Sequence, residues 1–349
     1  MRKNYPGLRA RRLIDAFLAF DEVDLIRLRI EYLRSIVAHT YVVESRFTFS
    51  GQPKPLHVRD ALASSRIDLS RVTFLEVPVP KALVRSGTAW EIEDFHRRWL
   101  AEYLEENHPD EAVVISDADE VPTRKQLEVA RRMVGIFGSM SLPMKTSVRF
   151  ANWIERPITL PLLKPKVSLG KRLRRYSRDS FSVPALGPRG VHLSYLGIDV
   201  GRLKQKYASF AHRELDHQRS STARVLSFAS AGMVHHVGRS EKLGAGVLCP
   251  EPPAVFNEFQ RLLLSTRADW FDFNAESPGW LVQLRMSQAL TDFLFDRADN
   301  LSDSDELSGS WKTGVLRRYL SSRIQWFTSR VKAWSRSLQN LLKGSAQLD

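Results

Sequence analysis

The sequence predicts an α/β domain in which a mostly parallel sheet is flanked by helices. Segments with the pattern of a strand alternate with helical segments from residue 12 to residue 116. Residues 112–116, AVVIS, are wholly apolar, which is typical of a strand at the centre of a parallel sheet. The chain has 349 residues and 43% apolar composition, enough for a sizeable core. A chain disordered throughout is therefore excluded.

The strands and helices follow from hydrophobic patterning. Besides 112–116, strands are expected at 12–20, at 38–44 and at 72–77, the last closed by prolines. A helix is expected at 22–36, where Leu25, Leu28, Tyr32 and Ile36 recur at helical spacing. A second is expected at 90–106, with Ile92, Phe95, Trp99, Leu100, Tyr103 and Leu104 on one side.

The pattern loosens after about residue 150. Residues 156–190 are rich in proline, glycine and arginine and predict a long basic loop within the domain. Helices are expected to resume at 199–212, 222–230 and 278–297. The domain is predicted to span 12–297, between a basic N-terminal tail, 1–11, and a polar linker, 298–310.

The charge is concentrated in two segments. The net charge is +13, and residues 156–178 and 308–349 each contain eight basic residues. The two segments together contain one acidic residue, Asp349. Each segment suggests an anionic partner such as phosphate or lipid head groups. Nucleic acid is not expected, because the charge is confined and no binding module is recognisable. The single cysteine, Cys249, excludes an intramolecular disulfide framework.

An acidic turn follows the apolar strand. Asp117, Asp119 and Glu120 lie in VVISDADEVP, residues 113–122. Ligands of open α/β sheets bind at the carboxyl ends of strands, and Mg²⁺ or Mn²⁺ prefers oxygen ligands completed by substrate phosphates. The turn thus suggests a metal and diphosphate site. Two alternatives are a solvated turn that caps a helix starting near Thr123, and the nucleophile motif of haloacid-dehalogenase-like phosphatases.

Four segments resemble glycosyltransferase family 17, the β-1,4-mannosyl-glycoprotein β-1,4-N-acetylglucosaminyltransferase family. They are FDEVDLIRLRIEYL (20–33), VVESRFTFSGQPKPL (42–56), SDADEVP (116–122), and GVHLSYLG (190–197) with SFAHRE (209–214). They occur in the family's order over roughly residues 12–215. Val191 stands where the family usually has tryptophan, which bears on the local shape of the pocket.

The resemblance implies a GT-A-like, Rossmann-like fold and a metal-dependent inverting glycosyltransferase. Its donor would be a nucleotide sugar, UDP-GlcNAc, with Mn²⁺ or Mg²⁺ held by Asp117 and Asp119. The expected acceptor is a glycan hydroxyl, and in a bacterial-type member a cell-surface or lipid-linked polysaccharide. The non-enzymatic alternative is a protein that binds membranes or nucleic acid.

Further residues are assigned candidate roles. Glu44, Arg97 and Asp117 are expected to contact the donor, although Glu44 could instead cap a helix or loop. Glu93 and Arg97 could equally form a surface ion pair. The catalytic base is left open among Glu93, Glu120, His192 and Glu214, with structural roles as the alternatives.

The C-terminal segment, 311–349, predicts a basic amphipathic helix. Apolar residues recur at steps of three and four over 312–342, with arginines and lysines between them. This pattern is typical of a helix lying on an anionic membrane surface, and also of a helix docked on its own domain or on a partner. The expected location is cytoplasmic, at the inner face of the membrane. No signal peptide is recognisable.

Overall fold

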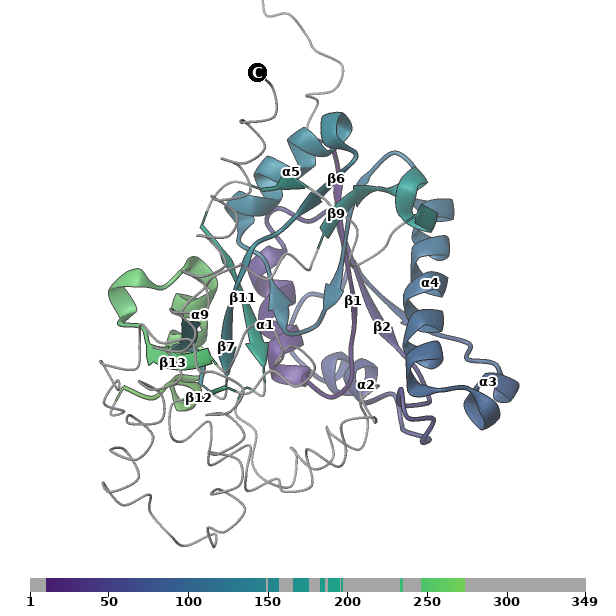
Figure 1. The fold of residues 1–349 in the computed structure, drawn as a ribbon, viewed down its shortest axis with the longest axis horizontal. Coiled ribbons are helices and arrows are strands. Elements are labelled where there is room, and N and C mark those ends of the chain that lie inside the picture. Colours follow the sequence, from purple (N-terminus) through teal and green to yellow (C-terminus); the bar gives the residue numbers. More distant parts are fainter. Residues whose placement is uncertain are drawn as a thin grey trace, which may run out of the picture.

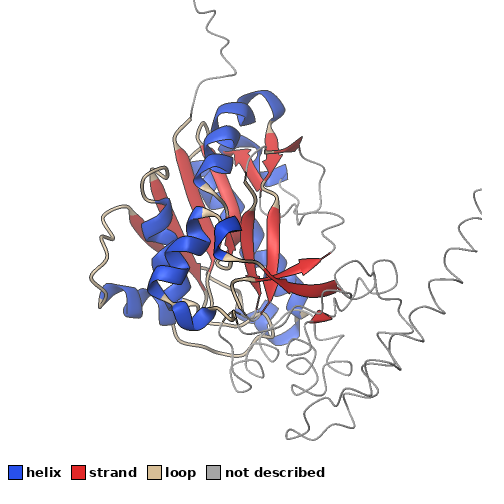
Figure 2. Cartoon of the chain, turned by 90° about the vertical axis from the view of Figure 1, so that its left-hand side faces the viewer, coloured by secondary structure: helices blue, strands red, loops and turns tan. Residues whose placement is uncertain are grey.

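The computed structural model describes residues 11–148, 150–156, 166–175, 183–185, 188–194, 196, 233–234 and 246–273. Figure 1 shows their arrangement, and Figure 2 shows helices on both sides of the strands. The predicted α/β class, with a mostly parallel sheet flanked by helices, is confirmed.

The larger sheet has the strand order β10-β6-β9-β4-β1-β2-β3. Its strands are β1 (Leu13–Leu18), β2 (His39–Glu44), β3 (Val72–Glu76), β4 (Ala112–Asp117), β6 (Ser139–Ser141), β9 (Lys166–Leu169) and β10 (Val183–Pro184). Strands β3, β2, β1 and β4 pair in parallel, so their carboxyl ends share one edge. This edge is where an open α/β sheet binds ligands.

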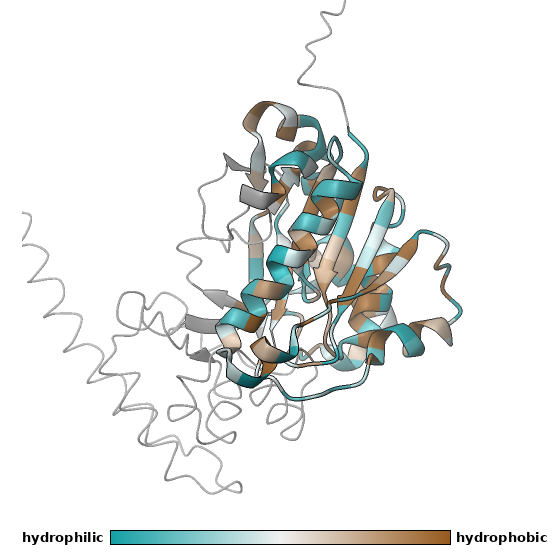
Figure 3. Cartoon of the chain, turned by 90° about the vertical axis from the view of Figure 1, so that its right-hand side faces the viewer, coloured by the Kyte–Doolittle hydropathy of each residue, from teal (hydrophilic) through white to brown (hydrophobic). Residues whose placement is uncertain are grey.

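Helices cover both faces of this sheet. On one face lie α1 (Val23–Leu33), α2 (His57–Ala63), α5 (Arg124–Phe137) and α9 (Glu258–Thr266), and on the other α4 (Ala89–Asn107), preceded by α3 (Lys81–Ser86). Side chains alternate along a strand, so Leu13 and Val114 pack with α1, while Ile14 and Ile115 pack with α4. Figure 3 looks onto the α4 face.

A second sheet has the order β12-β13-β8-β7-β11-β5. Its strands are β5 (Glu120–Val121), β7 (Met144–Val148), β8 (Trp153–Arg156), β11 (Gly190–Ser194), β12 (Met233–Val234) and β13 (Gly246–Pro250). Short 3-10 helices are η2 (Gly170–Arg175), η4 (Pro253–Val255) and η5 (Ala268–Trp270). Since β5 begins within the acidic turn, that turn joins the two sheets.

The elements predicted at 12–20, 22–36, 38–44, 72–77, 90–106 and 112–116 are all present. The prediction of a loop over 156–190 is wrong, because this range contains β9, η2, β10 and the first residue of β11. Strand β9 pairs antiparallel with β4, so β4 has one parallel and one antiparallel neighbour. The loop prediction relied on composition, which does not detect a four-residue strand paired with distant residues.

Several other predictions lie outside the described residues. They are the tail 1–10, the helices at 199–212, 222–230 and 278–297, the linker 298–310 and the amphipathic segment 311–349. Among the residues that are described, none belongs to a helix with the length and apolar character needed to span a membrane.

Candidate functional site

The acidic turn lies at the carboxyl edge of the parallel strands. Asp117 is the last residue of β4, and Glu120 is the first of β5. Strand alternation sends the side chains of β4 to different faces, so Ser116 contacts α1 and Asp117 contacts α4. The turn therefore receives side chains from both layers of helices.

On the α4 face, Arg97 joins two carboxylates. Its Nη2 donates to Asp117 Oδ1 at 2.9 Å and to Glu93 Oε1 at 2.8 Å, while its Nε donates to the same Glu93 oxygen at 3.0 Å. The side chains of Glu93, Arg97 and Asp117 are 16%, 14% and 30% exposed. The predicted pair one helical turn apart is present, and it is part of the acidic turn's surroundings rather than an isolated surface pair.

On the other side of the turn, Asp119 faces His192 of β11. His192 Nε2 lies 3.6 Å from Asp119 Oδ2 and 3.1 Å from Ser194 Oγ. Both contacts involve the same ring nitrogen, so these three residues do not form a Ser-His-Asp relay, which needs both nitrogens. Burial alone lowers the pKa of His192, but the carboxylates of the turn outweigh it and raise the pKa above its usual value.

The position of His192 depends on a close approach between strands. The Leu193 N–H donates to the Asp119 carbonyl at 2.9 Å. A β-carbon on Gly190 would lie 2.6 Å from the Val121 carbonyl oxygen and 2.3 Å from the Met144 sulfur, so only glycine fits there. Val191 is fully buried in the core, on the opposite strand face from His192, and therefore does not line the site.

Glu120 has a structural position in the turn. Its side chain is fully buried, and its Oε2 accepts a hydrogen bond from the Asp117 backbone N–H at 3.1 Å. A general base must reach the hydroxyl that it deprotonates, so this burial does not suit that role. Glu214, another candidate base, lies outside the described residues.

Glu44 is committed to a helix terminus. Its two carboxylate oxygens accept hydrogen bonds from the backbone N–H groups of Val58 and Arg59, at 3.1 and 3.0 Å, in the first turn of α2. The side chain is buried, and Lys54 Nζ lies 3.7 Å from it. Of the two predicted roles, the structure shows the cap, which is typical of a carboxylate at a helix N-terminus.

The capping explanation for the acidic turn is wrong. Helix α5 begins after Thr123, whose Oγ1 accepts from the Gln126 N–H at 3.2 Å, while Gln126 Oε1 accepts from the Thr123 N–H at 3.0 Å. This reciprocal capping box satisfies the helix terminus without Asp117 or Asp119.

One residue that supports the turn, Arg29 of α1, was not predicted. It is fully buried against Asp15 of β1 and contacts the acidic turn. Two signals in the sequence could have identified the pair. An aspartate interrupts the apolar strand 12–20, and an arginine lies on the apolar side of the following helix, one position after Leu28.

The acidic turn carries carboxylate oxygens, the type of ligand that a hard divalent cation prefers. Asp15 is bound by Arg29, and Glu93 and Asp117 by Arg97, whereas Asp119 lies beside His192 and the Glu120 carboxylate accepts a backbone N–H. Within the described ranges, no three histidine, cysteine, aspartate or glutamate side chains are grouped to hold a metal by themselves. Two carboxylates completed by substrate phosphates are a usual set for Mg²⁺. The sequence predicts Asp117 and Asp119 as such a pair.

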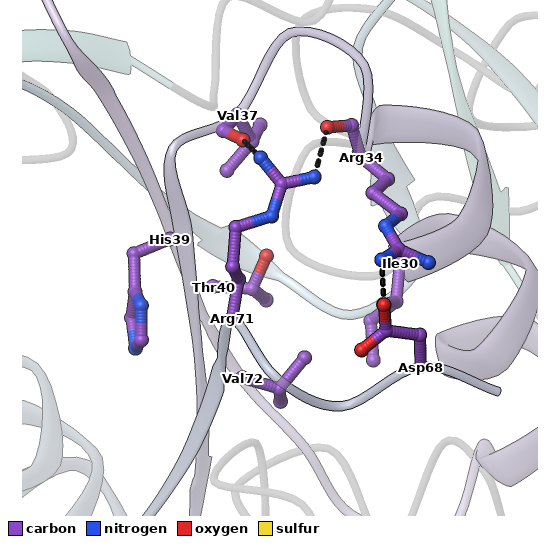
Figure 4. Close-up of a pocket in the computed structure, with 8 residues that line it drawn as sticks. All are labelled: Ile30, Arg34, Val37, His39, Thr40, Asp68, Arg71 and Val72. Carbon is purple, nitrogen blue, oxygen red and sulfur yellow. Dashed lines mark hydrogen bonds and ion pairs between the residues drawn. The ribbon is translucent and has the colours of Figure 1, made fainter.

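A separate small pocket lies near the amino end of β2 (Figure 4). Arg71 donates to the carbonyl oxygens of Val37 and Arg34, and the Arg34 side chain pairs with Asp68. His39 also lines it, and burial lowers the pKa of this histidine. Because Arg71 is bound to backbone carbonyl oxygens and Arg34 to Asp68, the pocket is a structural feature at the edge opposite the acidic turn.

The fold is that of an α/β protein with an acidic turn at the carboxyl ends of its parallel strands, the edge where open α/β sheets bind ligands. The model of the family described as "Glycosyltransferase family 17" matches residues 3–228. The chain belongs to glycosyltransferase family 17. This membership argues against the phosphatase alternative. In the structure, the acidic turn follows β4 of the mostly parallel sheet.

Curated relatives match about half of this chain. The human β-1,4-mannosyl-glycoprotein 4-β-N-acetylglucosaminyltransferase is 29% identical over 189 residues, which is 50% of this chain and 35% of that protein. The Rattus norvegicus protein of the same name is 29% identical over 189 residues, 50% of this chain and 34% of its own. The chain thus spans about a third of the length of these relatives.

Solved structures give weaker likenesses. The galactosyltransferase LgtC, in complex with donor and acceptor sugar analogues, has a TM-score of 0.30 and 13% identity, covering 47% of this chain and 60% of that one. Glucosyl-3-phosphoglycerate synthase from Mycobacterium tuberculosis, with Mn²⁺ and UDP-glucose, has a TM-score of 0.28 and 14% identity, covering 54% and 72%. Similarities this low carry no argument about the present site.

Proposed function

We propose that this chain is a metal-dependent inverting glycosyltransferase that uses a nucleotide-sugar donor, UDP-GlcNAc, and transfers the sugar to a glycan hydroxyl. One observation carries the proposal. In a chain of family 17, Asp117 and Asp119 lie at the carboxyl edge of the parallel strands. Asp117 lies beside Arg97 and Asp119 beside His192, and each of these neighbours can contact phosphate.

The residues have distinct parts in this proposal. Asp117 and Asp119 would hold Mn²⁺ or Mg²⁺, which neutralises charge on the leaving diphosphate. Arg97 is suited to a phosphate contact because its guanidinium is partly exposed and presents several donors in one plane. Glu93 and His192 are the candidate bases that lie beside the carboxylate pair. Glu120 is not one of them, because it is buried.

A donor panel tests this function. Binding and hydrolysis of UDP-, GDP- and CMP-sugars are measured with and without Mn²⁺ for the wild type, Asp119→Ala and a control, Asp94→Ala. Asp94 is an exposed residue of α4. We expect metal-dependent binding of UDP-GlcNAc that Asp119→Ala abolishes and Asp94→Ala preserves. Folded wild-type protein that binds no donor would contradict the proposal.

The same panel would also identify the sugar that is transferred, if one donor binds more tightly than the others. Binding of a different UDP-sugar would keep the class and correct the assignment of GlcNAc. The acceptor is proposed to be a cell-surface or lipid-linked polysaccharide, supported by the basic amphipathic pattern of 311–342. In this view the segment holds the enzyme at an anionic membrane surface.

A further inference from the structure

We propose that Arg29, held by Asp15, is a positioning residue that fixes the backbone of the acidic turn so that Asp117 and Asp119 can hold the metal and donor. This inference rests on the proposed function for the metal and the donor. The buried clamp itself is defined by contacts of the described residues.

Arg29 is fixed first by its partner on β1. Its Nε and Nη2 donate to the two carboxylate oxygens of Asp15 at 3.0 and 2.7 Å, the two-pronged geometry that gives an arginine one orientation. Both side chains are essentially fully buried, at 0% and 1% exposure. The guanidinium also lies over the Phe17 ring, 4.2 Å from its centre.

The remaining donor capacity of Arg29 is directed at the turn. Nη1 donates to three backbone carbonyl oxygens, those of Asp117 at 2.8 Å, Ala118 at 3.3 Å and Glu120 at 3.0 Å. Nη2 also donates to Ser116 Oγ at 2.7 Å. One side chain thus contacts every residue from 116 to 120 except Asp119.

These contacts determine which way the turn faces. The three carbonyl oxygens point inward, toward Arg29, and the buried Glu120 carboxylate accepts the Asp117 N–H. With its backbone groups satisfied from inside, the turn keeps Asp117 and Asp119 available to Arg97 and His192 at the surface. A buried carbonyl without a donor is costly, so the turn is expected to rearrange if Arg29 is lost.

The test replaces the buried pair while keeping the fold. Asp15→Leu combined with Arg29→Met removes both charges and fills the space, an exchange that buried ion pairs often tolerate. The control is Lys145→Met with Glu251→Leu, which removes another pair, 2.7 Å apart, between β7 and the segment after β13. Urea unfolding of the full chain identifies the variants that fold.

Two readouts are measured on folded protein. The first is amide hydrogen exchange of residues 116–121 without metal, where we expect the Asp15→Leu, Arg29→Met variant to exchange at least about tenfold faster than wild type. The second is Mn²⁺ affinity in the presence of UDP, expected to fall by about 10- to 100-fold. The control variant should change neither.

The outcomes separate this inference from the proposed function. Wild-type exchange in the folded double variant would show that Arg29 does not fix the turn. Faster exchange with unchanged Mn²⁺ affinity would overturn the positioning role of Arg29, because the turn would then not need Arg29 to hold metal. If the wild type itself bound no Mn²⁺ with UDP, the proposed function would fail, and the exchange measurement alone would decide whether the clamp exists.

A conservative variant keeps the test decisive if the double variant does not fold. Arg29→Lys retains the charge, but its single ammonium group cannot reach Asp15 and the three carbonyl oxygens together. We expect faster exchange of residues 116–121 and weaker Mn²⁺ binding, with the rest of the domain exchanging as in wild type. Unchanged exchange in Arg29→Lys would overturn the proposal.

Discussion

Two arginines reach the acidic turn from opposite faces of the sheet, and they contact it differently. Arg29, from α1, is fully buried and binds backbone carbonyl oxygens together with the Asp15 carboxylate. Arg97, from α4, is partly exposed and binds the side chains of Glu93 and Asp117. The buried arginine fixes the course of the chain, whereas the other one is accessible to a ligand.

The difference teaches how one turn can be both rigid and reactive. Contacts that fix a backbone work best where water is excluded, because a buried polar group must find its partner within the protein. Groups that bind substrate must be exposed enough to meet it. Strand alternation at β4 separates the two tasks by sending Ser116 and Asp117 to opposite faces.

The largest expected effect on stability comes from removing the buried arginine, Arg29, while its partner Asp15 stays. Arg29→Met leaves the Asp15 carboxylate buried without its partner, and should lower the free energy of unfolding by about 3–5 kcal/mol. Urea denaturation at pH 7 measures this. The double variant with Asp15→Leu should recover most of the loss. A loss below about 1 kcal/mol for Arg29→Met would show that the pair contributes little, against the comparison drawn above.

His96 sharpens the comparison, because it is a buried basic residue on the α4 face that pairs with no carboxylate within the described ranges. Burial lowers its pKa to about 4, and its Nε2 has no hydrogen-bond partner among the residues that the structure describes. The unfolded chain takes up this proton near pH 6.5, so stability is lost as pH falls from about 6.5 to about 4, by about 3 kcal/mol in all.

His96→Leu should remove that dependence. The variant is expected to show a smaller loss of unfolding free energy between pH 7 and pH 4 than the wild type, measured by urea denaturation at several pH values. His57→Leu is the control, since His57 is exposed on α2. Equal pH dependence in wild type and His96→Leu would show that His96 does not titrate as its burial implies.

The smallest expected effect on stability comes from replacing Arg97, the partly exposed arginine. Arg97→Ala should change the free energy of unfolding by less than about 1 kcal/mol, because partly exposed ion pairs contribute little. It should nevertheless weaken UDP binding by about tenfold, since a charge-assisted hydrogen bond to phosphate is lost. Calorimetric titration with UDP and Mn²⁺ measures the affinity. Arg98→Ala, an exposed neighbour, is the control, and equal affinities would remove Arg97 from the donor site.

Much of the larger sheet was predictable because its strands are apolar runs with clear ends. Strands β1, β2 and β4 fall inside the predicted ranges or within one residue of them. Strand β9 was missed, since a four-residue strand beside basic and proline-rich sequence gives no local signal, and its pairing with β4 is a tertiary contact. The second sheet was missed for the same reason, because β5 has two residues and β11 five.

The site was predictable where local sequence carried the chemistry. The acidic turn and the Glu93–Arg97 pair follow from spacing alone. The contact between Arg97 and Asp117 does not follow from spacing, because it depends on how α4 packs across the sheet. The burial of Glu120 and the capping role of Glu44 were likewise decided by neighbours distant in sequence. The same holds for Arg29, whose five hydrogen-bonded partner residues come from β1 and from residues 116–120.

The contacts of Arg29 with the turn also bear on which substitutions the site can accept. Between residues 117 and 120 it binds only carbonyl oxygens, which every amino acid possesses. The residue types at 117 and 119 can therefore be exchanged without removing a bond that sets the course of the chain. Variants with other metal-binding side chains at these two positions should keep the native backbone, which makes the turn a suitable starting point for engineering metal preference or donor choice.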